Sequence, residues 1–254
     1  MTNRHYWSLV WFKAVADLRA EAARSYLGAL WWILEPVLYL AAFYIVFKSM
    51  RQSADDVVSF LLCGLVVWKW FASTVMQGGN SIIRSAALMR QVYIPKYVFP
   101  LSTILANAFK FLFVFTLLIL FLLLMGYSPS AIWCWLPALL IVQFLLVSAV
   151  ALLLSALIPF IPDISDLLGN VILLLFFLSG VIFDISKAPE AIQAYLYLNP
   201  MAILVEDFRI VLVQGIAPEP VPLVAIALGS VFTLGVGSWL LLRYDRIYPK
   251  RILR

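Results

Sequence analysis

Residues 132–158 read IWCWLPALLIVQFLLVSAVALLLSALI, and none of them carries a charge. An α-helix needs about 20 consecutive apolar residues to cross the hydrocarbon core of a membrane, and this stretch exceeds that length. The strands of a membrane barrel would instead alternate polar and apolar side chains over about ten residues. Because this run is continuous and rich in leucine, it predicts a transmembrane helix.

Five further stretches pass the same test along the 254 residues of the chain. The predicted spans lie at residues 27–47, 57–77, 103–125, 132–158, 167–183 and 221–242. Hydrophobic residues make up 65% of the chain and charged residues only 12%, whereas a soluble domain carries roughly 25% charged residues. The composition predicts an all-α integral membrane protein with a single transmembrane domain over residues 1–254, and it excludes a soluble enzyme.

The lysines and arginines are distributed unevenly between the two sides that six spans create. The side with both termini and residues 78–96 carries twelve of them: Arg4, Lys13, Arg19, Arg24, Arg84, Arg90, Lys96, Arg243, Arg246, Lys250, Arg251 and Arg254. The other side carries four, namely Lys48, Arg51, Lys187 and Arg209. Cytoplasmic loops carry the excess of positive charge, so both termini are predicted to be cytoplasmic in a multi-pass inner-membrane protein. The net charge of +5 follows from this topology and does not indicate nucleic-acid binding.

Residues 5–25 are predicted to form a helix that lies on the membrane surface. The apolar residues Trp7, Trp11, Val15, Leu18 and Ala22 recur at helical spacing, and Lys13, Asp17, Glu21 and Arg24 share the opposite face. This pattern is typical of an interfacial helix whose tryptophans lie among the lipid headgroups. A packed cytoplasmic helix is the alternative.

Two connecting segments are expected to contain short helices of their own. In the cytoplasmic segment, Asn80 or Ser81 is expected to cap a helix that continues through Met89. The outer segment 184–220 contains two semi-apolar stretches, Glu190–Leu198 and Met201–Gly215, separated by Asn199-Pro200. These stretches are predicted to be short re-entrant helices that dip into the outer leaflet, packed against protein or a wet cavity.

The chain lacks the residues of several familiar catalytic sites. His5 is its single histidine, and the phosphate-binding pattern GxxxxGK[ST] is absent. Zinc sites and histidine-based catalysis need more ligands than one. No cofactor or metal is therefore expected in this chain, and any ATP that drives transport must be hydrolysed by another one.

Polar residues inside the predicted spans form rows with helical spacing. The rows are Lys69, Ser73 and Gln77, then Thr103, Asn107 and Lys110, and then Asp163, Asp166 and Asn170. A charge at the centre of a bilayer costs about 2.5–3.5 kcal/mol even on insertion scales, so such rows are expected to face a hydrated path. Lys69, with Glu35 as its possible counter-ion, is the strongest candidate for such a path. Helix–helix hydrogen bonding is the alternative.

Aromatic residues near these rows are candidate stacking surfaces for sugar rings. Tyr39 and Trp70 are the members assigned to the path, and Tyr44, Trp68 and Phe71 belong to the same group. Lipid contact or core packing is the alternative for each of them.

Four segments in order along the chain resemble the permeases of ABC-type polysaccharide exporters, which serve O-antigen, capsule and teichoic-acid export. They are residues 24–47 (RSYLGALWWILEPVLYLAAFYIVF), residues 88–108 (LMRQVYIPKYVFPLSTILANA), residues 163–170 (DISDLLGN) and the Asn199-Pro200 pair. The resemblance covers nearly the whole chain, and it rests on order and topology rather than on one motif.

The resemblance implies a homodimer with six spans per subunit and two copies of a separate ATPase, which would bind ATP and Mg²⁺. The N-terminal surface helix and the loop around residues 81–92 would contact that ATPase, with Arg84, Leu88, Met89 and Arg90 as the coupling residues. The outer helices would line the exit for a glycan or lipid-linked glycan. Alternatives are a drug or lipid permease of the same architecture, a membrane-embedded transferase and a passive channel.

The predicted topology can be tested with single cysteines in a variant that lacks Cys63 and Cys134. In intact cells, an impermeant thiol reagent should label Ala191→Cys, because residues 184–220 are expected outside. Ser85→Cys should be labelled only after the cells are permeabilised. Labelling of position 85 but not of position 191 in intact cells would contradict the topology.

Overall fold

The structure, a computed structural model, describes residues 3–23, 26, 28–48 and 54–252, without the side chains of residues 3–6, 29, 36, 39, 40, 43, 44, 46–48, 54–56 and 252. These residues contain helices and no strand. The longer helices are α1 (Asn3–Ala23), α2 (Trp31–Lys48), α3 (Ala54–Gly79), α6 (Val98–Leu124), α7 (Leu136–Leu157), α8 (Asp163–Leu178) and α11 (Pro220–Arg243). The shorter ones are η1 (Gly28–Leu30), α4 (Ser81–Arg84), α5 (Ala86–Gln91), η2 (Ala131–Trp135), η3 (Ile185–Lys187), α9 (Glu190–Leu196), α10 (Pro200–Arg209), η4 (Ile210–Gln214) and α12 (Tyr248–Ile252).

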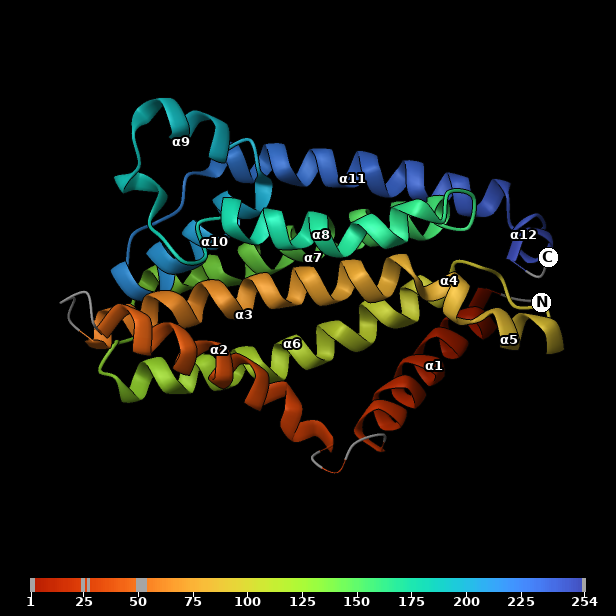
Figure 1. The fold of residues 1–254 in the computed structure, drawn as a ribbon, viewed down its shortest axis with the longest axis horizontal. Coiled ribbons are helices and arrows are strands. Elements are labelled where there is room, and N and C mark those ends of the chain that lie inside the picture. Colours follow the sequence, from red (N-terminus) through yellow and green to blue (C-terminus); the bar gives the residue numbers. More distant parts are fainter. Residues whose placement is uncertain (1–2, 24–25, 27, 49–53, 253–254) are drawn as a thin grey trace.

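One axis is roughly shared by α3, α6, α7, α8 and α11, whereas α1 and α2 are inclined to it, and most of the short helices gather at its two ends (Figure 1). α4, α5 and α12 lie at the end where both termini are found, and α9 and α10 lie at the opposite end. This is the arrangement that an even number of crossings requires. That the end with α4 and α5 faces the cytoplasm stays a prediction.

Four helical segments are long and apolar enough to cross a membrane among the described residues. They are Val57–Gly79, Val98–Leu124, Ala131–Leu157 and Pro220–Arg243, and each coincides with a predicted span. α8 has 16 residues and covers 163–178 rather than the expected 167–183, because the chain turns at Gly180, whose φ is 63°. At about 1.5 Å per residue, such a helix is shorter than the roughly 30 Å core of a typical bilayer. The count of six spans is therefore still a prediction.

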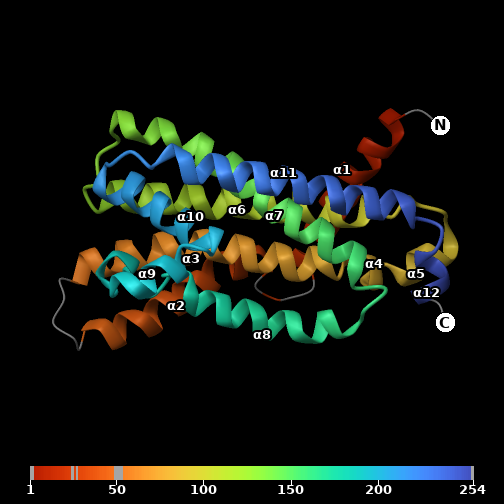
Figure 2. The same cartoon turned by 90° about the horizontal axis from the view of Figure 1, so that it is seen from above.

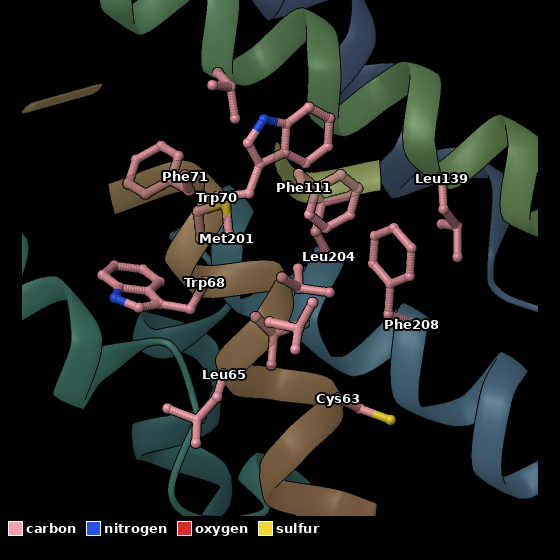
Figure 3. Packing of buried hydrophobic residues seen from close by; sticks show 14 of the residues in the cluster. Cys63, Leu65, Trp68, Trp70, Phe71, Phe111, Leu139, Met201, Leu204 and Phe208 are labelled. Atoms are coloured by element: carbon pink, nitrogen blue, oxygen red, sulfur yellow. The ribbon is translucent and has the colours of Figure 1, made fainter. Parts of the chain in front are cut away.

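α3 forms the centre of the main core and packs against α2, α6, α7, α8 and α10 (Figures 1 and 2). Its aromatic side chains meet residues from the neighbouring helices, as Figure 3 shows for Trp70 and Phe111. Phe208 of α10 lies in the same cluster and is fully buried. The outer helices are thus anchored in the same apolar core as the long helices.

Small residues bring α7 close to both of its main neighbours. A Cβ on Gly237 of α11 would lie 3.0 Å from the backbone nitrogen of Leu153. A Cβ on Gly78 of α3 would lie 2.9 Å from the Cβ of Ala151. Small residues let membrane helices pack with their backbones in near contact, and here they hold α7 between α3 and α11.

The short helices differ in how well their caps were predicted. Asn199 caps α10 as its position before Pro200 suggests, since its Oδ1 accepts a hydrogen bond from the backbone N–H of Met201 at 3.0 Å. Asn80 occupies the N-cap position of α4, but neither its side chain nor that of Ser81 makes the expected capping hydrogen bond. Its Nδ2 donates to the carbonyl oxygen of Met76 at 3.0 Å, and its Oδ1 accepts from the Ser165 hydroxyl at 2.6 Å. Asn80 therefore ties α3 to α8, and two short helices replace the expected single one.

Arg209 fastens the outer helices to the core, a role that the sequence did not indicate. Its guanidinium donates hydrogen bonds to the carbonyl oxygens of Phe60 at 3.0 Å, Gly180 at 2.6 Å and Val181 at 2.6 Å. It also lies 3.6 Å from the centre of the Phe60 ring. Only 5% of Arg209 is exposed, so it is not the solvated loop charge that the topology count treated it as.

Asp245 performs a similar role at the opposite end. Its carboxylate accepts hydrogen bonds from the Tyr93 hydroxyl at 2.6 Å and from the backbone N–H of Lys96 at 2.7 Å. Lys96 is buried, and its ammonium donates to the carbonyl oxygen of Ile94 at 2.7 Å. Burial lowers the pKa of Lys96 from its usual value, and nearby Asp245 opposes that shift. The C-terminal segment thereby holds the chain between α5 and α6 in place.

Candidate functional site

The first two polar rows meet on one side of α3. Lys69, Ser73 and Gln77 are all partly exposed, whereas Val67, Phe71 and Val75 on the opposite side are buried. The amide of Asn107 on α6 donates to Gln77 Oε1 at 3.3 Å and joins the two rows. The third predicted row does not take part: Asp163, Asp166 and Asn170 lie exposed on α8.

Two cavities follow this polar side. The smaller, called here the α3–α6 groove, has a volume of about 110 Å³ and is lined by Glu21, Trp32, Glu35, Val66, Lys69, Trp70, Ser73, Gln77, Asn107, Lys110, Phe111 and Val114. The larger, called here the α1 cavity, measures about 480 Å³ and is lined by Lys13, Asp17, Ala20, Glu21, Gln77, Ser81, Arg84, Ser85, Thr103, Ala106 and Lys110. Glu21, Gln77 and Lys110 belong to both, so the two cavities adjoin.

Ion pairs join the helices on the two sides of these cavities. Lys69 of α3 pairs with Glu35 of α2, which confirms the predicted counter-ion. Lys110 of α6 likewise pairs with Glu21 of α1. In each of these pairs the cation comes from α3 or α6 and the carboxylate from α1 or α2. A charge inside a membrane helix needs a partner or water, and each of these lysines has a carboxylate partner. The Lys69 side chain remains 39% exposed and that of Glu35 45% exposed.

The structure corrects the interpretation of Trp70 as a sugar-stacking surface. Trp70 is 5% exposed, and its ring stacks on Phe111 with 3.9 Å between ring centres and 9° between planes. Phe144 lies beside it at 6.4 Å. Because neighbouring rings cover it, Trp70 serves packing, as do the equally buried Trp68 and Phe71. The side chains of Tyr39 and Tyr44 lie outside the described residues.

Three of the four predicted coupling residues are on the surface. Arg84, Leu88 and Arg90 are exposed, but Met89 is buried in a cluster with Val98 and Tyr248. Met89 is therefore corrected from a contact residue to an anchor of α5. Arg84 also lines the α1 cavity, which the sequence did not indicate.

α1 differs from the predicted interfacial helix in what its charged face contacts. Trp7, Trp11 and Phe12 are exposed, as a membrane contact requires, and Val10 and Ala14 are buried against α6. The face with Asp17 and Glu21 borders the α1 cavity, and both carboxylates remain partly exposed. The helical spacing identified the charged face, but only the fold shows what that face meets.

No cluster of three or more histidine, cysteine, aspartate or glutamate side chains that is fit to hold a metal occurs in the described part of the chain.

The sequence model of a family described as ABC-2 type transporter matches residues 10–213. An O-antigen export system permease protein of Klebsiella pneumoniae is 29% identical over 201 residues, which are 78% of each chain. A protein with the same description from Myxococcus xanthus is 29% identical over 227 residues, covering 87% of this chain and 86% of that one. A polysialic acid transport protein of Escherichia coli is 27% identical over 234 residues, or 87% of each chain.

The ion pair between Lys69 and Glu35 predicts a specific pattern of stabilities. Glu35→Gln should lower the thermal unfolding midpoint of the purified protein, because it leaves Lys69 without its carboxylate. The double variant Glu35→Gln/Lys69→Leu should recover most of that loss. Since both side chains are partly exposed, the coupling energy should be about 1 kcal/mol.

Glu190→Gln is the matched control, because Glu190 is exposed at the start of α9 and far along the chain from the groove. It should leave the midpoint unchanged. Equal midpoints for Glu35→Gln and the unaltered protein would show that the pair does not stabilise the fold.

Proposed function

The chain belongs to the ABC-2 type transporter family, and on that premise we propose that it is the membrane-spanning permease half of an ATP-driven polysaccharide exporter. It would move a polysaccharide or lipid-linked glycan from the cytoplasm across the inner membrane. The names of its relatives, which describe O-antigen export and polysialic acid transport, favour this substrate class over drugs or simple lipids.

The observation that carries the proposal is the polar side of α3 and α6 within otherwise apolar helices. The two adjoining cavities are bordered on this side by Lys69, Ser73, Gln77 and Lys110. A polymer of hydroxylated sugars needs hydrogen-bonding groups in place of the water that it leaves. We assign these four residues to the path, with Glu21 and Glu35 holding α1 and α2 over it.

The ATPase that drives transport is proposed to be a separate chain. Two copies of an ATP-binding cassette ATPase, which bind ATP and Mg²⁺, would join two copies of the permease at the end that holds α4, α5 and both termini. That end would be cytoplasmic. The outer helices α9 and α10 would then lie at the exit, dipping into the outer leaflet, where Tyr195 and Leu198 are strongly exposed.

Leu88 and Arg90 form the proposed ATPase contact, with Arg84 at its edge. They project from α4 and α5, which Met89 and Ile82 anchor in the protein and which Asp245 steadies through Tyr93. A small exposed apolar group flanked by cations fits a groove with an acidic rim, and few residues usually carry the energy of such a contact. A firmly held helix transmits a push from the motor to α6.

The variant Leu88→Glu tests both the proposed ATPase contact and the proposed export function. It should reduce co-purification of the ATPase and lower surface glycan in cells that carry only this permease. Ile161→Glu is the control and should change neither, since Ile161 is exposed and follows Phe160, whose ring contacts Tyr248 of α12 at the same end. Unchanged assembly and unchanged surface glycan with Leu88→Glu would reject the contact, and normal surface glycan in cells without this chain would reject the function.

A further inference from the structure

The α1 cavity has the size and lining of a binding site in its own right. Its volume of about 480 Å³ lies within the range of about 300–1,000 Å³ that small-molecule pockets occupy. Hydroxyl, amide and charged groups from α1, α3, α4 and α6 line it. It adjoins the α3–α6 groove but has different side chains at its far end, where Ser81, Arg84 and Ser85 are found.

The charges of this lining do not cancel. Lys13 pairs with Asp17 at 2.6 Å, and Lys110 pairs with Glu21. Arg84 has no ion-pair partner among the residues that the structure describes. The cavity therefore carries one positive charge in excess, and that charge belongs to a guanidinium, whose planar fork suits the paired oxygens of a phosphate.

An unpartnered hydroxyl points to the same ligand. Ser81 is only 5% exposed, and its Oγ has no hydrogen-bond partner within the described part of the chain. A buried hydroxyl without a partner is unfavourable, so a ligand toward which the Ser81 side chain rotates to donate a hydrogen bond gains affinity. Ser81, Arg84 and Ser85 are spaced at i, i+3 and i+4, which places them on one side of the chain at α4.

We propose that the α1 cavity binds the phosphate of a lipid headgroup at the cytoplasmic boundary of the membrane. Arg84 pairs with the phosphate, and the hydroxyls of Ser81 and Ser85 donate to its remaining oxygens. Trp7 and Trp11, exposed on α1, belong at the level of the headgroups and set the depth of the cavity. A neutral sugar would leave the charge of Arg84 unmatched, so it fits less well.

Such a phosphate has two sources. One is an ordinary membrane phospholipid, and the other is the phosphate linker of a lipid-linked glycan. The second source rests on the proposed export function, whereas binding of the headgroup does not.

Binding to the purified full-length permease in neutral detergent tests the proposal. Short-chain phosphatidylglycerol should bind, and short-chain diacylglycerol, which lacks the phosphate, should bind at least tenfold more weakly. Arg84→Gln should weaken phosphatidylglycerol binding by about tenfold or more, the loss expected for a hydrogen bond to a charged group. Ser81→Ala should weaken it a few-fold without lowering the unfolding midpoint, because the hydroxyl has no partner in the described part of the chain. Arg246→Gln, at an exposed arginine of the same end, should bind normally.

Equal affinity of Arg84→Gln and the unaltered protein would overturn the proposal, and so would equal binding of the two lipids. A short-chain prenyl diphosphate added as a competitor identifies the source. Tighter binding than phosphatidylglycerol indicates the glycan linker, and weaker binding indicates a membrane phospholipid; either result supports the site. Normal surface glycan in cells without this chain would refute the export function and leave the binding result intact.

Discussion

The structure depends on how a positive charge is accommodated inside an apolar helix bundle. Lys69 lies in the middle of α3, the helix at the centre of the core, and hydrocarbon would be a costly place for its ammonium. The chain brings Glu35 of α2 to it and keeps both side chains partly exposed. The polar side of α3, the matching side of α6 and the position of α2 follow from this one requirement. The opposite side of α3 is then free to build the core.

The same helix connects the two ends of the molecule. Near its start, the carbonyl oxygen of Phe60 accepts a hydrogen bond from Arg209, which fixes the outer helix α10. Just beyond its end, Asn80 binds Ser165 of α8 and leads directly into α4. A shift of α4 under the force of a motor would therefore reach the outer helices through one continuous helix. The ion pair of Lys69 with Glu35 of α2 lies between these ends, where such a shift would change the shape of the α3–α6 groove.

The sequence indicated the features that depend on periodicity and local chemistry. Spacing alone placed Lys69, Ser73 and Gln77 on one side, and the Asn199-Pro200 pair marked the start of α10. Features that depend on which helices meet were missed. Trp70 is stacked on Phe111, and Met89 is buried. The sequence did not indicate this, because the identity of an apolar residue does not tell whether it contacts a partner, a ligand or the core. Arg209 was hidden because its partners are backbone carbonyls, which every residue has.

The central claim is that the charge of Lys69 serves a hydrated export path rather than packing. The double variant Lys69→Leu/Glu35→Gln tests it most directly, because it removes the lysine without leaving an unpaired carboxylate. Thr116→Leu, at an exposed polar residue of α6 outside the groove, is the control. Surface glycan should be measured in cells whose membranes contain equal amounts of each variant. The account predicts that surface glycan falls with the double variant and stays normal with the control, and normal surface glycan with the double variant would contradict it.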